Sequence, residues 1–198
     1  MIENILNILS IIHIKIFLIS ILFFIIGYAA APTAYYKEIR FLTAYPLWVA
    51  KKMEAWAKKK WHPALLFLFL FSMNSISLLL NFFSGYVPGL PVIFAIWTGL
   101  NIGLITYHTL KGQYYFVSLA NPVALFELPA AFISFTAAIQ FNISYFFPDL
   151  FSLPQVSFSG YMTLYYFITL PLLVISGIIE TILIIFSQKF EDFDDNNL

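Results

Sequence analysis

Five long apolar stretches dominate the sequence and restrict what the chain can fold into. They cover residues 5–31, 63–84, 88–110, 122–146 and 161–186. Each is close to the ~20 residues that an α-helix needs to cross a bilayer. Only 10% of the residues are charged, against about 25% in a soluble domain. We therefore predict an all-α, polytopic membrane helix bundle of five transmembrane helices, forming a single integral membrane domain over residues 1–198.

The first apolar stretch has a second interpretation as a cleavable signal peptide. Ala29-Ala30-Ala31 resembles the small-residue site at which such peptides are cut. Against this, the residues before the stretch are apolar rather than basic, and Pro32 follows directly after the candidate cut. We expect a transmembrane helix with its core at residues 16–31, and the preceding turns either at the interface or extending that helix.

Seven of the ten basic residues lie between residues 37 and 60, in the connection after the first stretch. From Pro46, which suits the first turn of a helix, apolar and basic side chains separate onto opposite faces. This pattern predicts an amphipathic helix over residues 46–61 that lies on the membrane surface, with a solvated loop as the alternative. Its expected contacts with lipid headgroups are Lys51, Lys52, Lys58, Lys59, Lys60 and Trp56.

The placement of these charges also predicts partners and orientation. Basic residues beside transmembrane helices favour lipid headgroups over nucleic acid, so the bilayer is the expected partner and nucleic acid is not. Basic connections usually face the cytoplasm. We therefore predict a multi-pass protein of the cell membrane with the 37–60 connection and the C-terminus in the cytoplasm, and the N-terminus outside.

Two carboxylates lie within the predicted spans, Glu127 in the fourth and Glu180 in the fifth. An unpaired charge at bilayer depth costs from roughly 3 to more than 10 kcal/mol. At ~1.5 Å per residue, Glu127 lies ~8 Å inside the start of its helix and Glu180 ~9 Å inside the end of its own. These two ends share one side of the membrane, so the carboxylates should form one layer near His108. Asn74 and Asn101 should share a second layer nearer the bilayer centre.

The carboxylate layer has more than one interpretation. Pro129 and Pro171 cannot donate to the carbonyls four residues earlier, which leaves acceptors for a protonated carboxyl or an asparagine amide. The layer would then be a neutral, hydrogen-bonded clasp between the fourth and fifth helices. Alternatively, it handles protons or cations, or it receives a cation from a partner.

Small residues predict where helices approach closely. Gly99 and Gly103 form the small-x-x-x-small pattern of membrane helix pairs, but the pattern does not say whether the partner helix belongs to the same chain or to a second copy. The turn GYVPGLP, residues 85–91, predicts an antiparallel hairpin of the second and third helices. Asn121 can cap the fourth helix, with Pro122 in its first turn.

The residues required for common membrane chemistries are missing. The sequence has no cysteine, which excludes disulfides and thiolate metal sites. No aspartate lies within a span, the three histidines are in different segments, and neither a His-Glu-x-x-His motif nor a phosphate-binding glycine loop occurs. We therefore predict a protein that is not an enzyme and that binds no cofactor and no metal.

Four segments carry a family resemblance: FSMN at 71–74, TGLNIG at 98–103, NPVALFELPA at 121–130 and LPLLVISGIIET at 170–181. With these segments the chain resembles the stage II sporulation protein M family over roughly residues 68–186. In the family's fourth-helix motif Pro122, Glu127 and Pro129 match, as does Glu180 in the last helix. Val123 and Ala124 stand where the family usually has histidine and glycine, so no role of that histidine is carried over. The asparagine–glycine pair of the third helix is also altered, to Gly99-Leu100-Asn101.

The resemblance implies a small integral membrane protein of about five helices. In spore-forming bacteria it implies a subunit of a complex that remodels peptidoglycan, in which the protein is a membrane platform for wall hydrolases. Relatives also occur in organisms that form no spores.

Two functions fit these observations. The first is a non-enzymatic membrane scaffold that assembles with other membrane proteins or with a second copy of itself. The alternative is a proton- or ion-coupled transporter, or a subunit of one, that uses the Glu127/Glu180 layer. A sealed layer would favour the scaffold, and a water-filled path to Glu127 would favour transport.

Overall fold

The computed structural model describes residues 7–57, 59, 61–149, 153 and 156–195. Five of its helical segments are long and apolar enough to cross a membrane. They are α2 (Ile14–Tyr36), α4 (Pro63–Ser84), α5 (Leu90–Thr109), α6 (Ala124–Phe146) and the continuous run of α7 (Phe158–Leu164), η2 (Tyr165–Thr169) and α8 (Leu170–Asp195). The predicted all-α membrane bundle is confirmed, and the protein is a multi-pass membrane protein.

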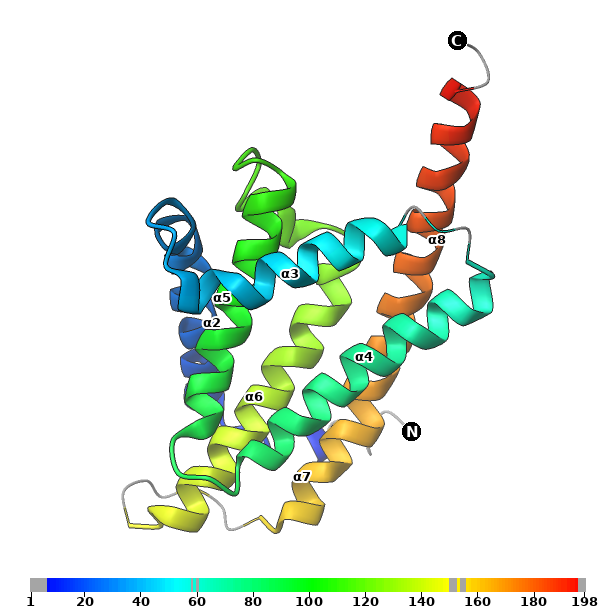
Figure 1. Cartoon of the computed structure of the whole chain (residues 1–198). Coiled ribbons are helices and arrows are strands. Elements are labelled where there is room, and N and C mark those ends of the chain that lie inside the picture. Colours follow the sequence, from blue (N-terminus) through cyan, green and yellow to red (C-terminus); the bar gives the residue numbers. More distant parts are fainter. Residues whose placement is uncertain (1–6, 58, 60, 150–152, 154–155, 196–198) are drawn as a thin grey trace.

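The spans alternate in direction, and α3 (Arg40–Ala57) lies across one end of the bundle (Figure 1). The end of α8 lies on that same side, which we call the α3 end. The turn between α4 and α5, residues 85–89, lies at the opposite end, which we call the hairpin end. Gly89 has a φ of 72°, a left-handed conformation that glycine adopts without steric cost and that lets this turn be short.

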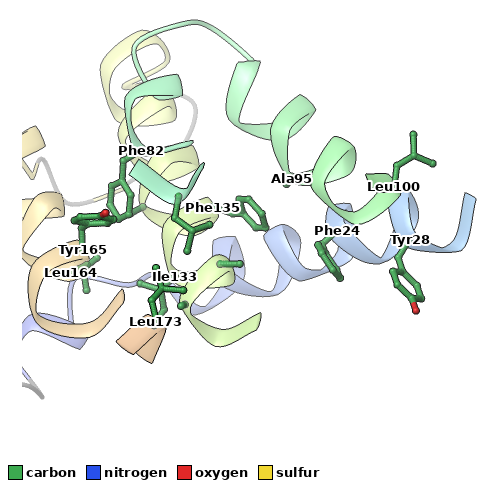
Figure 2. Close-up of a cluster of buried hydrophobic side chains, with 14 of the residues drawn as sticks. Phe24, Tyr28, Phe82, Ala95, Leu100, Ile133, Phe135, Leu164, Tyr165 and Leu173 are labelled. Carbon is green, nitrogen blue, oxygen red and sulfur yellow. The ribbon is translucent and has the colours of Figure 1, made fainter. Parts of the chain in front are cut away.

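Helix α6 is the centre of the bundle. It contacts α2, α4, α5 and α8, and its residues 130–142 are all buried except Phe132. Ile133 and Phe135 pack among core side chains from the other helices, which Figure 2 shows on both sides of α6. Lipid offers no hydrophobic drive for helix association, so this packing depends on fit and on hydrogen bonds between helices.

The first span differs from its predicted bounds. It begins at Ile14 rather than residue 5, and it continues through Pro32 to Tyr36 instead of ending at residue 31. Residues 1–6 lie outside the described part of the chain. Proline removes the hydrogen bond to the carbonyl four residues earlier, here that of Tyr28. The hydroxyl of Tyr115 donates to this same carbonyl, at 2.5 Å, so the helix passes the proline with that acceptor satisfied.

A reciprocal pair joins α2 to the connection after α5. The Tyr28 hydroxyl donates to the backbone carbonyl of Tyr115 at 2.6 Å, and the two rings stack with centroids 4.4 Å apart. Because Tyr115 is buried, its pKa is raised above the usual tyrosine value. The phenol therefore stays protonated and keeps its role as a donor.

We expect Tyr115→Phe to lower the free energy of unfolding by about 1–3 kcal/mol, because the Tyr28 carbonyl is left buried without a donor. Thermal unfolding of the purified protein in detergent measures this. Tyr114→Phe is the control, since Tyr114 is 78% exposed. Equal stability of the two variants would contradict the assignment.

Because the pKa of Tyr115 is raised, its contribution to the stability of the fold depends on pH. The unfolded tyrosine ionises near pH ~10, whereas the folded one holds its proton longer, so this contribution to stability is complete below that pH and declines above it. Tyr115→Phe should lose less stability than wild type between pH 9 and 11.

The surface helix also begins earlier than predicted. Helix α3 starts at Arg40, so Pro46 is inside it rather than in its first turn. The face formed by Thr43, Pro46 and Ala50 is buried, and α3 packs mainly on α5. Tertiary packing, and not the preference of proline for a first turn, therefore sets where this helix begins.

The last span contains a π-helical segment, η2, directly before Pro171. Proline cannot complete the normal hydrogen bond of an α-helix, and π turns often occur where the α-helical pattern is interrupted. The helix is also longer than the predicted 161–186, since Ser157 caps its start by accepting from the N–H of Gly160 at 3.3 Å.

Candidate functional site

Glu127 and Glu180 come together at the contact between α6 and α8, within electrostatic range of one another. Glu127 lies in the first turn of α6, closer to the helix end than the predicted ~8 Å. The side chain of Asn121 caps this end by accepting from the N–H of Ala124 at 2.9 Å. Negative charge is favoured near a helix N-terminus, so the local structure makes the position of Glu127 less costly.

The carboxylates themselves have no hydrogen-bond or ion-pair partner among the described residues. Both side chains are half-buried, and no hydrogen bond or ion pair of either carboxylate is found within the described part of the chain. Oε2 of Glu180 is fully buried without a partner. The side chains of the two glutamates therefore do not form the predicted hydrogen-bonded clasp by themselves.

The other predicted polar residues are held elsewhere. His108 Nδ1 is 3.2 Å from the Tyr35 hydroxyl, a contact between α5 and α2. Asn101 donates to the Trp97 carbonyl of its own helix at 2.7 Å, and its Oδ1 is buried without a partner. Asn74 is half-buried on α4. These three side chains make no hydrogen bond to the carboxylates among the described residues, so the structure does not join them into one polar centre.

The carbonyls freed by Pro129 and Pro171 receive no side-chain donor among the residues that the structure covers. These carbonyls belong to Leu125 and Phe167. The same proline effect does supply an acceptor at Pro32, where Tyr115 fills it. A freed carbonyl with a side-chain donor therefore occurs at Pro32, which the predicted bounds of the first span had placed outside the helix.

The small-residue face of α5 packs on α2 of the same chain. A Cβ on Gly99 would overlap the Phe24 carbonyl oxygen, and one on Gly103 would lie 3.0 Å from the Tyr28 carbonyl oxygen. Gly27 on α2 lies equally close to α5, because a Cβ there would overlap the Ile96 carbonyl oxygen. The sequence did not say whether the partner helix belongs to the same chain or to a second copy. The structure shows that it is α2 of the same chain.

The predicted headgroup residues lie at the α3 end. Lys51, Lys52 and Lys59 are exposed, and the Lys52 ammonium lies 5.9 Å from the centroid of the Trp48 ring. Trp56 is half-buried against Phe69 of α4, with ring centroids 4.9 Å apart. Lys58 and Lys60 lie outside the described residues.

Sequence reasoning missed the polar residues that tie α6 to its neighbours. Gln140 accepts from the His13 N–H at 2.8 Å and donates to the Ile11 carbonyl at 3.0 Å. Asn142 donates to the Gly85 and Val87 carbonyls, both at 2.8 Å. Amides within an apolar span were the available signal, but the sequence does not say which backbone groups they reach.

Two further hydrogen-bonded links hold α6, and they use Ser20, Asn81 and Ser134, which their place in apolar spans predicts to face other helices. Asn81 of α4 donates to the Ser134 hydroxyl at 3.0 Å, and that hydroxyl donates to the Leu78 carbonyl at 3.0 Å. Ser20 of α2 lies 3.0 Å from Thr136, hydroxyl to hydroxyl. The polar contacts that hold α6 are therefore in its middle and at the hairpin end, not in the carboxylate layer.

Comparison with known proteins identifies one family. The sequence model of the stage II sporulation protein M family matches residues 14–183. Searches of curated proteins and of solved structures found no significant match. Within the residues that the structure describes, no group of three histidine, aspartate or glutamate side chains could hold a metal ion.

Proposed function

Because the chain belongs to the stage II sporulation protein M family, we propose that it is a non-enzymatic membrane scaffold that assembles with other membrane proteins. We further propose that Glu127 and Glu180 form its contact with the partner. The observation that carries this proposal is the seam between α6 and α8, where two half-buried carboxylates lie within electrostatic range of one another and have no partner among the residues that the structure describes.

The energetics favour a partner at this position. A carboxylate pair within the membrane is stabilised by an opposite charge or by hydrogen-bond donors. The basic residues nearest along the chain are Lys111, in the turn after α5, and Lys189, nine residues beyond Glu180. A lysine, arginine or amide from a neighbouring transmembrane helix would neutralise the pair, and a second copy of this chain is one such neighbour.

The same proposal includes an orientation. The 37–60 connection and the end of α8 lie on one side of the bundle (Figure 1), and most of the chain's bases are in that connection. Positive connections stay in the cytoplasm. We place the α3 end in the cytoplasm, so the carboxylate seam lies in the cytoplasmic half of the membrane.

We expect the double variant Glu127→Gln/Glu180→Gln to fold normally but to lose most of the partner that wild type retains. The loss of one charge-assisted contact is worth about 1.5–3 kcal/mol, which corresponds to a tenfold or greater loss of affinity. The measurement is quantitative co-purification from native membranes, with the bound membrane proteins, including untagged copies of this chain, identified by mass spectrometry.

Glu54→Gln is the matched control, because Glu54 is exposed on α3 and away from the seam. It should retain the partner at wild-type levels. Equal recovery of every partner by the double variant and by wild type would refute the role of the carboxylates.

Proton- or ion-coupled transport through the same layer is the second candidate. One observation favours it: Oε2 of Glu180 is buried without a protein partner, so water or an ion is needed to satisfy it. A transport role predicts that the conservative change Glu180→Gln abolishes flux in vesicles, although it preserves the shape of the side chain.

A further inference from the structure

The last membrane span carries a row of buried oxygen atoms that have no hydrogen-bond partner within the part of the chain that the structure describes. They belong to Tyr161, Thr169, Ser176 and Glu180, and the Ser75 hydroxyl on the adjacent helix α4 is in the same condition. Tyr161, Thr169 and Ser176 are 0% exposed, and Ser75 is 8% exposed. The Tyr161 hydroxyl lies beside Gln140 and Ser144 without a hydrogen bond to either.

The lack of a hydrogen-bond partner is specific to the hydroxyls on one face of the last span. Thr163 and Thr181 of the same span donate to backbone carbonyls, Thr163 to Gly160 at 2.5 Å and Thr181 to Gly177 at 2.7 Å. That is the usual way in which a hydroxyl is satisfied in an apolar helix. Thr169 and Ser176 do not use it, although the backbone offers them the same kind of acceptor.

The unpartnered groups follow one line along the span. Ser176 is seven residues after Thr169, two helical turns, and Glu180 is one turn further. Tyr161 lies eight residues before Thr169, across the π-helical segment, whose wider turn changes the phase of the helix. From Tyr161 to Glu180 the rise is ~28 Å at 1.5 Å per residue, nearly the ~30 Å of the hydrocarbon core.

Helix α4 lies beside the longest interval in this line. The Tyr165 hydroxyl donates to the Ser75 carbonyl at 2.9 Å, which places Ser75 beside the π-helical segment. The Ser75 hydroxyl also lies near that of Tyr165. We call Tyr161, Ser75, Thr169, Ser176 and Glu180 the hydroxyl row.

A buried polar atom without a partner is costly in a membrane, and ordered water is the usual partner of such atoms in native proteins. We propose that the hydroxyl row binds a file of water molecules that carries protons between the hairpin end and the Glu180/Glu127 pair. The ion is a proton rather than a metal cation, because the row offers scattered single hydroxyls and a metal cation needs about six oxygens at one point.

The titratable groups around this route are few. Helix α4 has none, and α6 contributes Glu127 at the Glu180 level and Tyr145 at the hairpin end. The proton-carrying part of this inference rests on the second candidate function, transport, for which it names the ion and the route. Co-purification tests the assembly role and proton flux tests the route, so either proposal can fail without the other.

Flux is measured on the full-length protein in proteoliposomes with an internal pH-sensitive dye, under a potassium diffusion potential set with valinomycin. We expect wild type to conduct protons. Thr169→Val and Ser176→Val should lower the rate at least about tenfold, because each leaves an apolar gap in the file. Thr169→Ser keeps the hydroxyl and should keep the rate, which separates loss of the route from loss of folding. Thr181→Val is the matched control and should conduct like wild type.

The absence of cysteine from the sequence permits a second readout of the same route. Single variants Thr169→Cys and Ser176→Cys should react with Ag⁺, which reaches thiols through water, whereas Thr181→Cys should not. Wild-type flux no greater than that of protein-free vesicles would overturn the proposal. Absence of Ag⁺ reaction at Thr169→Cys and Ser176→Cys would overturn it as well, and so would equal reaction at Thr181→Cys.

Discussion

Gly99→Ala is expected to destabilise the protein by at least about 3 kcal/mol, at the upper end of what overpacking costs. A single methyl group at this position would overlap the carbonyl oxygen of Phe24 and lie 2.9 Å from its carbonyl carbon. Both atoms are backbone atoms of α2, so no side chain can rotate to make room. The helices must separate, and α2 and α5 form the most extensive helix–helix contact in the bundle.

Gly177→Ala is the matched control for this change. It makes the same substitution in α8, where the nearest atom to the new methyl is a ring carbon of Phe67 at 3.2 Å. A ring can shift by a few tenths of an ångström, so we expect a cost within about 1 kcal/mol. Thermal unfolding followed by circular dichroism, together with the yield of monodisperse protein in detergent, distinguishes the two variants.

The effect of Gly99→Ala at different protein concentrations also tests whether the small-residue face packs within the chain or against a second copy. Because Gly99 packs against α2 of the same chain, the effect of Gly99→Ala should be the same in dilute and concentrated samples. If the loss of stability appeared only where the protein self-associates, the face would serve a second copy and the internal assignment would be wrong.

Gln140→Met is the second substitution for which we expect a large effect. Gln140 is 0% exposed, and its amide satisfies the Ile11 carbonyl and the His13 N–H. Helix α2 has no side-chain cap of its own at this end. Methionine keeps the length of the side chain but leaves both partly buried backbone groups unpaired, at about 1–3 kcal/mol for each. We expect a loss of about 2–6 kcal/mol in total.

Gln113→Met provides the control, since Gln113 is exposed in the turn after α5. It should leave the unfolding temperature unchanged within error. Hydrogen exchange adds a local readout, because the amides of the first turn of α2 should exchange faster in Gln140→Met while those of α8 do not. Uniform acceleration over both helices would indicate general destabilisation instead of a lost cap.

Some contacts of the prolines in this chain were predictable from the sequence, and others were not. The proline rule is local, so the sequence alone says that Pro129 and Pro171 each remove one helical hydrogen bond. It applies to Pro32 only because the structure continues the first helix past residue 31. Which donor bonds to the freed carbonyl depends on residues far along the chain. Tyr115 reaches the carbonyl of Tyr28, 87 positions away, whereas the carbonyls before the other two prolines have no side-chain donor among the described residues.

The burial of the polar residues within the spans was also only partly predictable from the sequence. Their position in apolar segments predicts that they face other helices, and Ser20, Asn81 and Ser134 are indeed buried. Ser77, which the same spacing would place beside Asn81, is exposed. Helical periodicity gives the angle between residues on one helix, but the neighbours of that helix determine which angle is covered.

The membrane-spanning architecture is the part of this protein that was predictable from its sequence. Length and hydropathy predict the five spans, because crossing a bilayer is a requirement on each segment separately. The family resemblance likewise depends on local motifs, and the match over residues 14–183 confirms it.

Which helices meet, and which polar groups are satisfied, became known only from the three-dimensional fold. It places Gly99 against α2, makes Gln140 and Asn142 caps for distant backbone groups, and brings Glu127 and Glu180 within electrostatic range of one another, with no hydrogen bond to either carboxylate among the described residues. The physical reason is that packing and hydrogen bonding in a bilayer join residues more than 50 positions apart, and the period of a single helix contains no information about its neighbours.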